Sequence, residues 1–227
     1  MDIILVAGLW LDGSAWHDVA AELKGLGHRP VALDLPGQGD GVTAATLDDQ
    51  VRAVVRAVDQ ATPPVLVVGH SAAATLAWMV ADARPDRVGR VVMIGGFPSA
   101  DGEVYNDSFP AVDGVVPFPG WEVFDGPDIA DLDEDLRSAI RARTVPVPEQ
   151  VACGVVRLHD QRRFGIPVTV VCPEFTPAQA RQWIDEGALP ELARVRDLHL
   201  VDIDSGHWPM FTRPAELAAL LGAAADA

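Results

Sequence analysis

The sequence predicts an α/β fold in which about six mostly parallel strands form a doubly wound sheet. Short, continuous apolar runs such as 3–6 and 65–68 are typical of strands that are buried on both faces. Segments with apolar residues at helical spacing alternate with these runs. The alternation stops at Phe97 and resumes near Pro167, which indicates one long insertion.

In the first half of the chain, each strand is followed by a loop and then by a helical pattern. The second helix has a clear beginning, because Thr46-Leu47-Asp48-Asp49 resembles a capping box. Gly95-Gly96 ends the fourth strand. The predicted strands here are 3–6, 31–34, 65–68 and 91–94, and the predicted helices are about 16–25, 47–58 and 74–81.

The second half begins with an irregular segment that is rich in proline and aromatic residues. Its aromatic side chains are expected to pack against something, and they are Tyr105, Phe109, Phe118, Trp121 and Phe124. Later, Thr176 precedes Pro177 as an N-cap precedes proline at the first helical position. The predicted strands here are 168–171 and 198–203, and the predicted helices are about 129–143, 177–183, 191–195 and 214–223.

Length and composition indicate one domain with a sizeable core. The chain has 227 residues, and we predict a single domain over 1–227, with a core of 1–96 and 166–227 and an insertion of 97–165. The net charge of −16 argues against nucleic acid and anionic membrane surfaces as partners.

Location and cofactors follow from what the sequence contains. No apolar run approaches the ~20 residues of a membrane span, and Met1-Asp2 leads directly into the first strand without a basic leader. We therefore expect a cytoplasmic protein. Cys153 and Cys172 show neither metal nor redox spacing, and no ligand-spaced cluster in the sequence suggests a metal or an organic cofactor, so neither is expected.

The third strand runs into Gly69-His70-Ser71-Ala72-Ala73, and a helix follows. A strand, a sharp turn with serine at its apex and a helix together form the context in which a G-x-S-x-G pattern has a mechanism. The residues two positions before and after the serine must be small, because strand and helix nearly collide there. Gly69 meets this requirement, and Ala73 stands where the pattern has glycine.

This turn resembles the nucleophile elbow of the α/β-hydrolase superfamily, and two further loops strengthen the resemblance. Ala7-Gly8-Leu9 resembles the H-G-x loop, with alanine in place of the usual histidine, and Gly206-His207-Trp208-Pro209 resembles the histidine loop. The resemblance covers nearly the whole chain and implies that 97–165 is a lid. It also implies Ser71 as nucleophile, His207 as base, and the backbone N–H groups of Leu9 and Ala72 as the oxyanion hole.

The resemblance places the third triad member, a carboxylate, in the loop after the strand 168–171. Glu174 is the carboxylate in that loop and is our assignment, although the usual G-x-x-D pattern is absent and a simple alignment puts Phe175 or Thr176 at the expected position. Four other carboxylates stay open as alternatives: Asp202, Asp204, Asp101 and Glu103. The remaining five histidines have no placement that favours catalysis: His17, His28, His70, His159 and His199.

The activity implied by the resemblance is hydrolysis of small, mainly neutral carboxylic esters through an acyl-enzyme. We expect an apolar substrate pocket beneath the lid, flanked by Trp10, Trp208 and Met210. Hydroxynitrile lyases of this superfamily have threonine and lysine at the positions of Gly8 and Trp208, which argues against cyanohydrin cleavage.

Two other functions stay open at this point: C–C bond cleavage on the same triad, and a ligand receptor that keeps a vestigial triad. The expected partner is a small-molecule substrate. The sequence leaves both the physiological substrate and the oligomeric state open, a homo-oligomer included.

Overall fold

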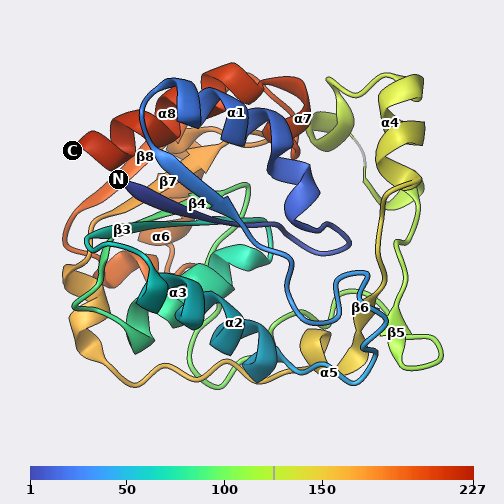
Figure 1. Ribbon diagram of the computed structural model, residues 1–227, viewed down its shortest axis with the longest axis horizontal. Coiled ribbons are helices and arrows are strands. Elements are labelled where there is room, and N and C mark those ends of the chain that lie inside the picture. The colour runs from blue at the N-terminus through green and yellow to red at the C-terminus, as the bar shows by residue number, and fades with distance from the viewer. Residues whose placement is uncertain (125) are drawn as a thin grey trace.

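The computed structural model describes residues 1–124 and 126–227, and its centre is one six-stranded sheet (Figure 1). The strand order is β2-β1-β3-β4-β7-β8, and all neighbouring strands are parallel. The strands are β1 (Asp2–Val6), β2 (Arg29–Ala32), β3 (Val65–His70), β4 (Val88–Ile94), β7 (Val168–Cys172) and β8 (Leu198–Asp202). The predicted fold class is therefore confirmed.

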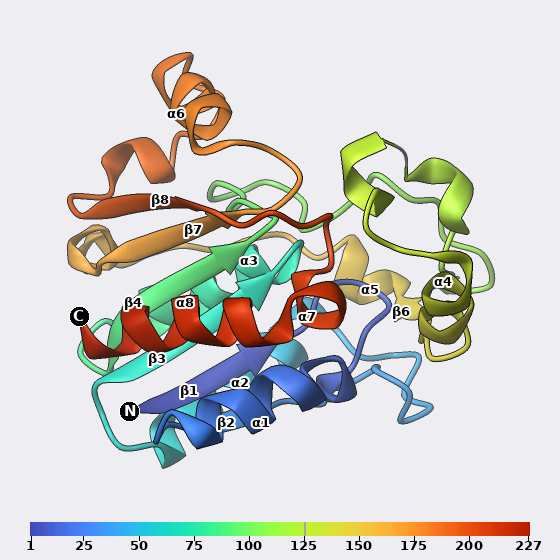
Figure 2. The ribbon, with the colours of Figure 1, turned by 90° about the horizontal axis from the view of Figure 1, so that it is seen from above.

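Helices cover both faces of the sheet, as Figure 2 shows from above. One face carries α1 (His17–Gly25) and α8 (Pro214–Asp226), and the other carries α2 (Leu47–Gln60), α3 (Ala73–Ala83) and α6 (Pro177–Asp185). Successive strand side chains point to opposite faces, so the continuous apolar run of β1 supplies both cores. Ile3 and Leu5 belong to the core under α1 and α8, while Ile4 and Val6 belong to the other.

Local sequence sets the starts of two of these helices. Thr46 caps α2 by accepting a hydrogen bond from the N–H of Asp49, whose carboxylate accepts one from the N–H of Thr46. Thr176 and Gln179 form the same reciprocal pair at the start of α6, with proline at the first helical position.

Several elements differ from their predicted bounds. The fourth strand is Val88–Ile94 rather than 91–94, and the short helix predicted at about 191–195 is the 3-10 turn Leu192–Arg194. The second strand is Arg29–Ala32 rather than 31–34, because it is an exposed edge strand and its apolar residues do not mark its extent. Asp34 instead accepts a hydrogen bond from the N–H of Gly13 in the loop after β1. The helix predicted at 129–143 is shorter, since Asp133 caps it by accepting from the N–H of Leu136.

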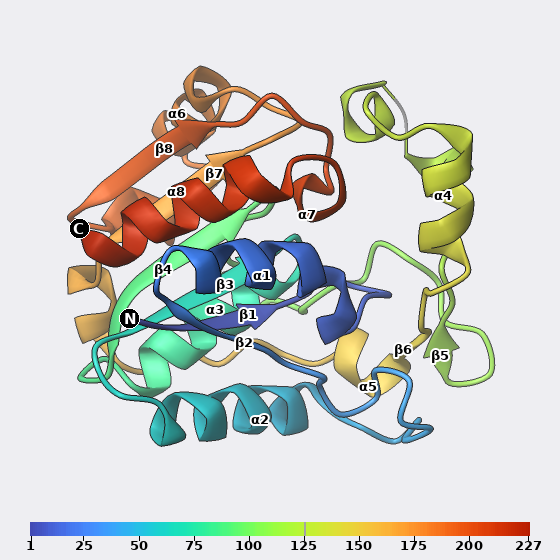
Figure 3. The same cartoon turned by 45° about the horizontal axis from the view of Figure 1, so that its top comes forward.

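The elements of the predicted insertion up to α5 (Glu149–Ala152) lie at the carboxyl end of the strands, and the chain after α5 runs back to the start of β7 (Figures 1 and 3). The insertion contains the antiparallel pair β5 (Val115–Val116) and β6 (Val147–Pro148), with α4 (Glu134–Arg141) and α5. Asp125, which the predicted insertion includes, lies outside the described residues. The bounds of the lid and the single-domain organisation stay predictions.

Short helical elements complete the chain. The helix α7 (Pro209–Thr212) follows the predicted histidine loop. The single 3-10 turns are η1 (Gly13–Trp16), η2 (Trp121–Val123), η3 (Gly126–Ile129), η4 (Gln161–Gly165) and η5 (Leu192–Arg194). Within residues 1–124 and 126–227, no helix has the length and apolar character needed to cross a bilayer.

Candidate active site

The turn after β3 holds Ser71 in a strained conformation at the carboxyl edge of the sheet. Its φ is +55°, which lies in the left-handed region that non-glycine residues seldom adopt. The turn is tight, because a Cβ added at Gly69 would lie 2.1 Å from the carbonyl oxygen of Ala73. That close approach involves the backbone of Ala73 and not its side chain, which explains why alanine is accommodated there.

Ser71, His207 and Glu174 form one hydrogen-bonded chain. His207 Nε2 lies 3.0 Å from Ser71 Oγ, and His207 Nδ1 lies 2.7 Å from Glu174 Oε1. The three residues come from the loops after β3, β8 and β7, whose carboxyl ends meet at the same edge of the sheet. The imidazole and the carboxylate are 15% and 14% exposed, so solvent reaches this pair only in part.

The four alternative carboxylates have other surroundings. Asp202 and Asp204 are exposed. Asp101 accepts a hydrogen bond from the N–H of Leu158, and Glu103 accepts one from Ala100. Among the five candidates, Glu174 is the carboxylate that the structure brings to His207. Its catalytic role stays a prediction.

Glycines that the sequence analysis did not place in the site leave room for these side chains. Gly95 has a φ of +56°, and a Cβ there would lie 3.1 Å from His207 Nδ1 and 3.2 Å from Glu174 Oε2. A Cβ at Gly96 would lie 2.3 Å from the carbonyl oxygen of Ser71. The sequence signal that could have identified these two glycines is their position as a Gly-Gly pair at the end of the strand beside the elbow.

The predicted oxyanion loop lies against the nucleophile. A Cβ added at Gly8 would lie 2.9 Å from Ser71 Cβ, and Leu9 follows directly. Ala72 is the N-cap of α3, at the helix end that favours negative charge. Within the part of the chain that the structure describes, the N–H groups of Leu9 and Ala72 donate to no protein acceptor. They stay available for a ligand oxygen, which is the role predicted for them.

Trp10 connects the oxyanion loop to the insertion. Its φ is +63°, its indole Nε1 donates to the carbonyl of Val116 at 3.2 Å, and its own carbonyl accepts from the N–H of Val145. Its ring meets those of Phe109, Phe118 and Phe124 edge to face, at centroid distances of 4.8, 5.5 and 6.2 Å.

The other two residues predicted to flank a substrate pocket are also buried. Trp208 packs edge to face against Trp121 and Phe124 of the insertion and against the ring of His207. Met210 is 1% exposed and belongs to the core on the α8 side. Contact of Trp10, Trp208 and Met210 with substrate stays a prediction.

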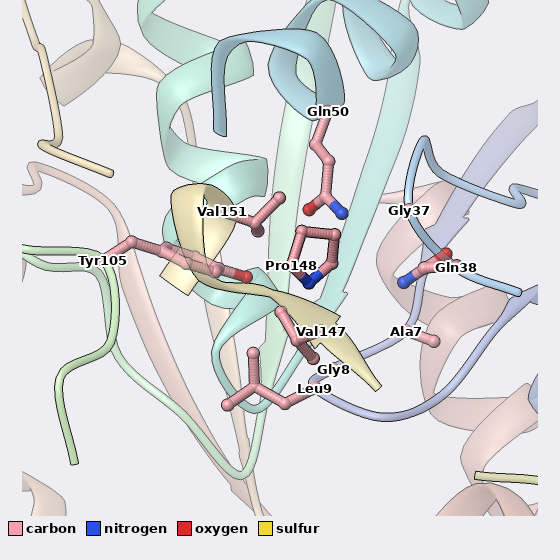
Figure 4. A pocket seen from close by; sticks show the side chains of 10 residues that line it. All are labelled: Ala7, Gly8, Leu9, Gly37, Gln38, Gln50, Tyr105, Val147, Pro148 and Val151. Carbon is pink, nitrogen blue, oxygen red and sulfur yellow. The ribbon is translucent and has the colours of Figure 1, made fainter. Parts of the chain in front are cut away.

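A narrow pocket lies behind the oxyanion loop, between α2 and the insertion (Figure 4). The Tyr105 hydroxyl points into it, and burial raises the pKa of this phenol, so the hydroxyl keeps its proton. The lining residues are Ala7, Gly8, Leu9, Gly37, Gln38, Gln50, Tyr105, Val147, Pro148 and Val151. In the described ranges, no cluster of three or more His, Cys, Asp or Glu residues could hold a metal ion.

Comparisons with known proteins found a matching family model and similar sequences. A model of the alpha/beta hydrolase family matches residues 3–220. The lipase LipV of Mycobacterium tuberculosis is 29% identical, over 96% of this chain and 91% of that protein. Methylesterase 7 of Arabidopsis thaliana is 24% identical, over 98% of this chain and 95% of that one.

Solved structures have the same fold. An extracellular alpha/beta-hydrolase from a Paenibacillus species superposes with a TM-score of 0.80 at 20% identity, covering 97% of both chains. A methylesterase from Arabidopsis superposes with a TM-score of 0.78 at 15% identity, covering 100% of this chain and 99% of the other.

Proposed function

Because the chain belongs to the alpha/beta hydrolase family, we propose that it hydrolyses small, mainly neutral carboxylic esters through an acyl-enzyme on Ser71. The observation that carries this proposal is the chain of hydrogen bonds from Ser71 through His207 to Glu174, built on a strained elbow. A serine hydroxyl is a weak nucleophile at neutral pH and needs such a base.

The proposed reaction begins when His207 Nε2 takes the proton of Ser71 Oγ while the oxygen attacks the ester carbonyl carbon. Negative charge then develops on the carbonyl oxygen, which the N–H groups of Leu9 and Ala72 stabilise. Losing one such donor typically costs ~3 kcal/mol of transition-state stabilisation. His207 next passes the proton to the departing alkoxide, so the alcohol leaves neutral.

The second half of the cycle repeats these steps with water. Water gives a proton to His207 Nε2 as its oxygen attacks the acyl carbon, and the acid leaves as Ser71 recovers its proton. Throughout, Glu174 accepts the hydrogen bond from Nδ1–H and stabilises the imidazolium that forms twice per cycle. Cofactor chemistry has no part in this proposed cycle.

Ester cleavage is the chemistry named for the relatives, a lipase and methylesterases. The preference for neutral esters rests on two features of this chain. Its net charge of −16 repels anionic substrates at long range, and aromatic rings of the insertion surround the loops that carry Trp10 and His207.

The test compares wild type with Ser71→Ala on short-chain aryl esters, with burst and steady-state phases recorded separately. Wild type should turn over continuously, and Ser71→Ala should lose activity while keeping its Tm, because alanine fits the turn. Near wild-type turnover by Ser71→Ala would refute the nucleophile assignment. A burst without steady turnover would favour a ligand receptor with a vestigial triad.

Substrate charge is tested with a panel of neutral and dianionic esters at low and high salt. Neutral esters should be preferred, most strongly at low ionic strength where charge repulsion is least screened. Dianionic esters that react faster at low salt would contradict the proposed preference. Cleavage of a β-diketone in place of every ester would favour the C–C hydrolase alternative.

A further inference from the structure

His70 lies between the two loops that the proposed reaction needs. It is the last residue of β3, directly before Ser71, and it is 1% exposed. Its Nε2 lies 2.8 Å from the backbone carbonyl oxygen of His207, and the two imidazole rings are 4.9 Å apart between centroids. On the other side of the ring, a Cβ added at Gly8 would lie 3.0 Å from His70 Nδ1.

The partner of Nε2 determines how this imidazole is protonated. A carbonyl oxygen can only accept a hydrogen bond, so His70 Nε2 carries the proton and donates it. Burial, and then the nearby His207, lower the pKa of His70 to about 3. The ring is therefore neutral at any pH at which an ester would be assayed, and Nδ1 is unprotonated.

We propose that His70 is a positioning residue that sets the orientation of His207 by donating a hydrogen bond to its main-chain carbonyl. This inference rests on the proposed function, since it concerns the geometry of the same base. His70 does not touch the reacting atoms and is not a catalytic residue.

The surroundings of His207 show why the hydrogen bond from His70 affects the orientation of the His207 ring. The N–H of His207 donates to the carbonyl of Asp128 at 2.8 Å, so the backbone of His207 is held from both sides. The side chain must reach Ser71 Oγ and Glu174 Oε1 at the same time. A shift of the main chain at His207 would move the ring away from one of these partners.

The neutrality of His70 also matters. The proposed cycle places a positive charge on His207 twice, and a protonated neighbour at 4.9 Å between ring centres would oppose that charge. A neutral imidazole supplies a strong donor to the carbonyl without this repulsion. The same position could not be filled by lysine or arginine without opposing the imidazolium.

The test is a matched pair of variants, His70→Gln and His70→Met. The two side chains have similar length and volume, but glutamine can donate to the carbonyl of His207 and methionine cannot. We expect His70→Met to lose about 10- to 100-fold in kcat, the size of loss that follows from slight misplacement of a reacting group. KM should change little, and His70→Gln should keep most of the wild-type kcat at a comparable Tm.

Nitrogen-15 NMR of histidine-labelled wild type gives a readout that depends neither on activity nor on the folding of a variant. His70 should show the Nε2–H tautomer and should not titrate between pH 5 and pH 8, as its pKa of about 3 requires. In His70→Met, the downfield proton of the His207–Glu174 hydrogen bond should shift or broaden, and in His70→Gln it should persist.

Several outcomes would overturn the inference. Equal kcat in the two variants would show that the donated hydrogen bond is not what matters. An Nδ1–H tautomer, or titration of His70 near pH 6.5, would show that Nε2 does not donate to His207. If the wild type neither cleaves esters nor is labelled at Ser71 by a fluorophosphonate, the proposed function is refuted but the inference about His70 is not. The tautomer of His70 and the proton of the His207–Glu174 hydrogen bond would still report on the role of His70.

Discussion

Replacing Glu174 with glutamine removes one negative charge and almost no volume from the candidate active site. Glu174 Oε1 lies 2.7 Å from His207 Nδ1, and both side chains are largely shielded from water. At an effective dielectric constant of about 20, unit charges 4 Å apart attract by about 4 kcal/mol. The imidazolium that forms during the proposed cycle would lose this stabilisation.

A loss of about 4 kcal/mol in transition-state stabilisation corresponds to about a 10³-fold fall in kcat. A second effect adds to it. If glutamine presents its NH₂ group to Nδ1, the imidazole proton moves to Nε2. The Nε2 atom then has no lone pair with which to take the proton of Ser71, so His207 cannot act as a base. We therefore expect Glu174→Gln to lose about 10³- to 10⁴-fold in kcat.

The assay is steady-state hydrolysis of an aryl ester near neutral pH, with Tm measured for each protein. Asp204→Asn is the matched control, because Asp204 is close to His207 in sequence but exposed. It should keep nearly full activity. A loss below 10-fold for Glu174→Gln, together with a large loss for Asp204→Asn, would refute the assignment of the acid.

Two further predictions concern backbone strain and acid stability. Gly95→Ala and Gly102→Ala both put a side chain at positive φ and should each cost about 1 kcal/mol of stability. Only Gly95→Ala should also lower kcat for ester hydrolysis, since only its Cβ would meet His207 and Glu174, at 3.1 to 3.3 Å. Equal kcat in these two variants would contradict this. Hydrogen bonds from Thr46, then from Arg52, lower the pKa of Asp49 to about 2, so its stabilising contribution is complete above about pH 4 and is lost as the pH falls toward 2. Urea unfolding should show Asp49→Asn as less stable than wild type at pH 6, by a margin that shrinks as the pH falls through 2. A difference that does not change with pH would refute the capping argument.

Much of the fold could be predicted from the sequence because local patterns carry it. Continuous apolar runs such as Ile3–Val6 mark strands that are buried on both faces, and the capping box at Thr46 marks a helix start. The same reasoning failed at Arg29–Ala32, because an edge strand has exposed side chains and its apolar residues do not record its pairing with β1. It also placed the start of α4 too early, since Asp133 caps that helix from a position inside the predicted range.

The elbow and the loop around His207 could likewise be recognised in the sequence, because each is a contiguous motif with a structural purpose. Ser71 needs a small residue two positions before it, and Gly69 supplies one. The choice of Glu174 among five carboxylates could not be made from a contiguous motif in the same way. It depends on where the loop after β7 carries a carboxylate relative to a histidine 33 residues away, and no local pattern encodes that distance.

Only the tertiary structure assigned roles to Gly95 and His70. In the sequence, Gly95 is one of two glycines at a strand end, and His70 is a histidine beside the serine for which no hydrogen-bond partner can be predicted. In the fold, parallel strands bring the ends of β3, β4, β7 and β8 to one edge, so that Gly95 leaves room for His207 and His70 donates to its carbonyl. The sequence by itself determined the elements and the loops that carry chemistry, because both are local. The contacts among those loops were decided by strand order, because they join residues that are far apart in the chain.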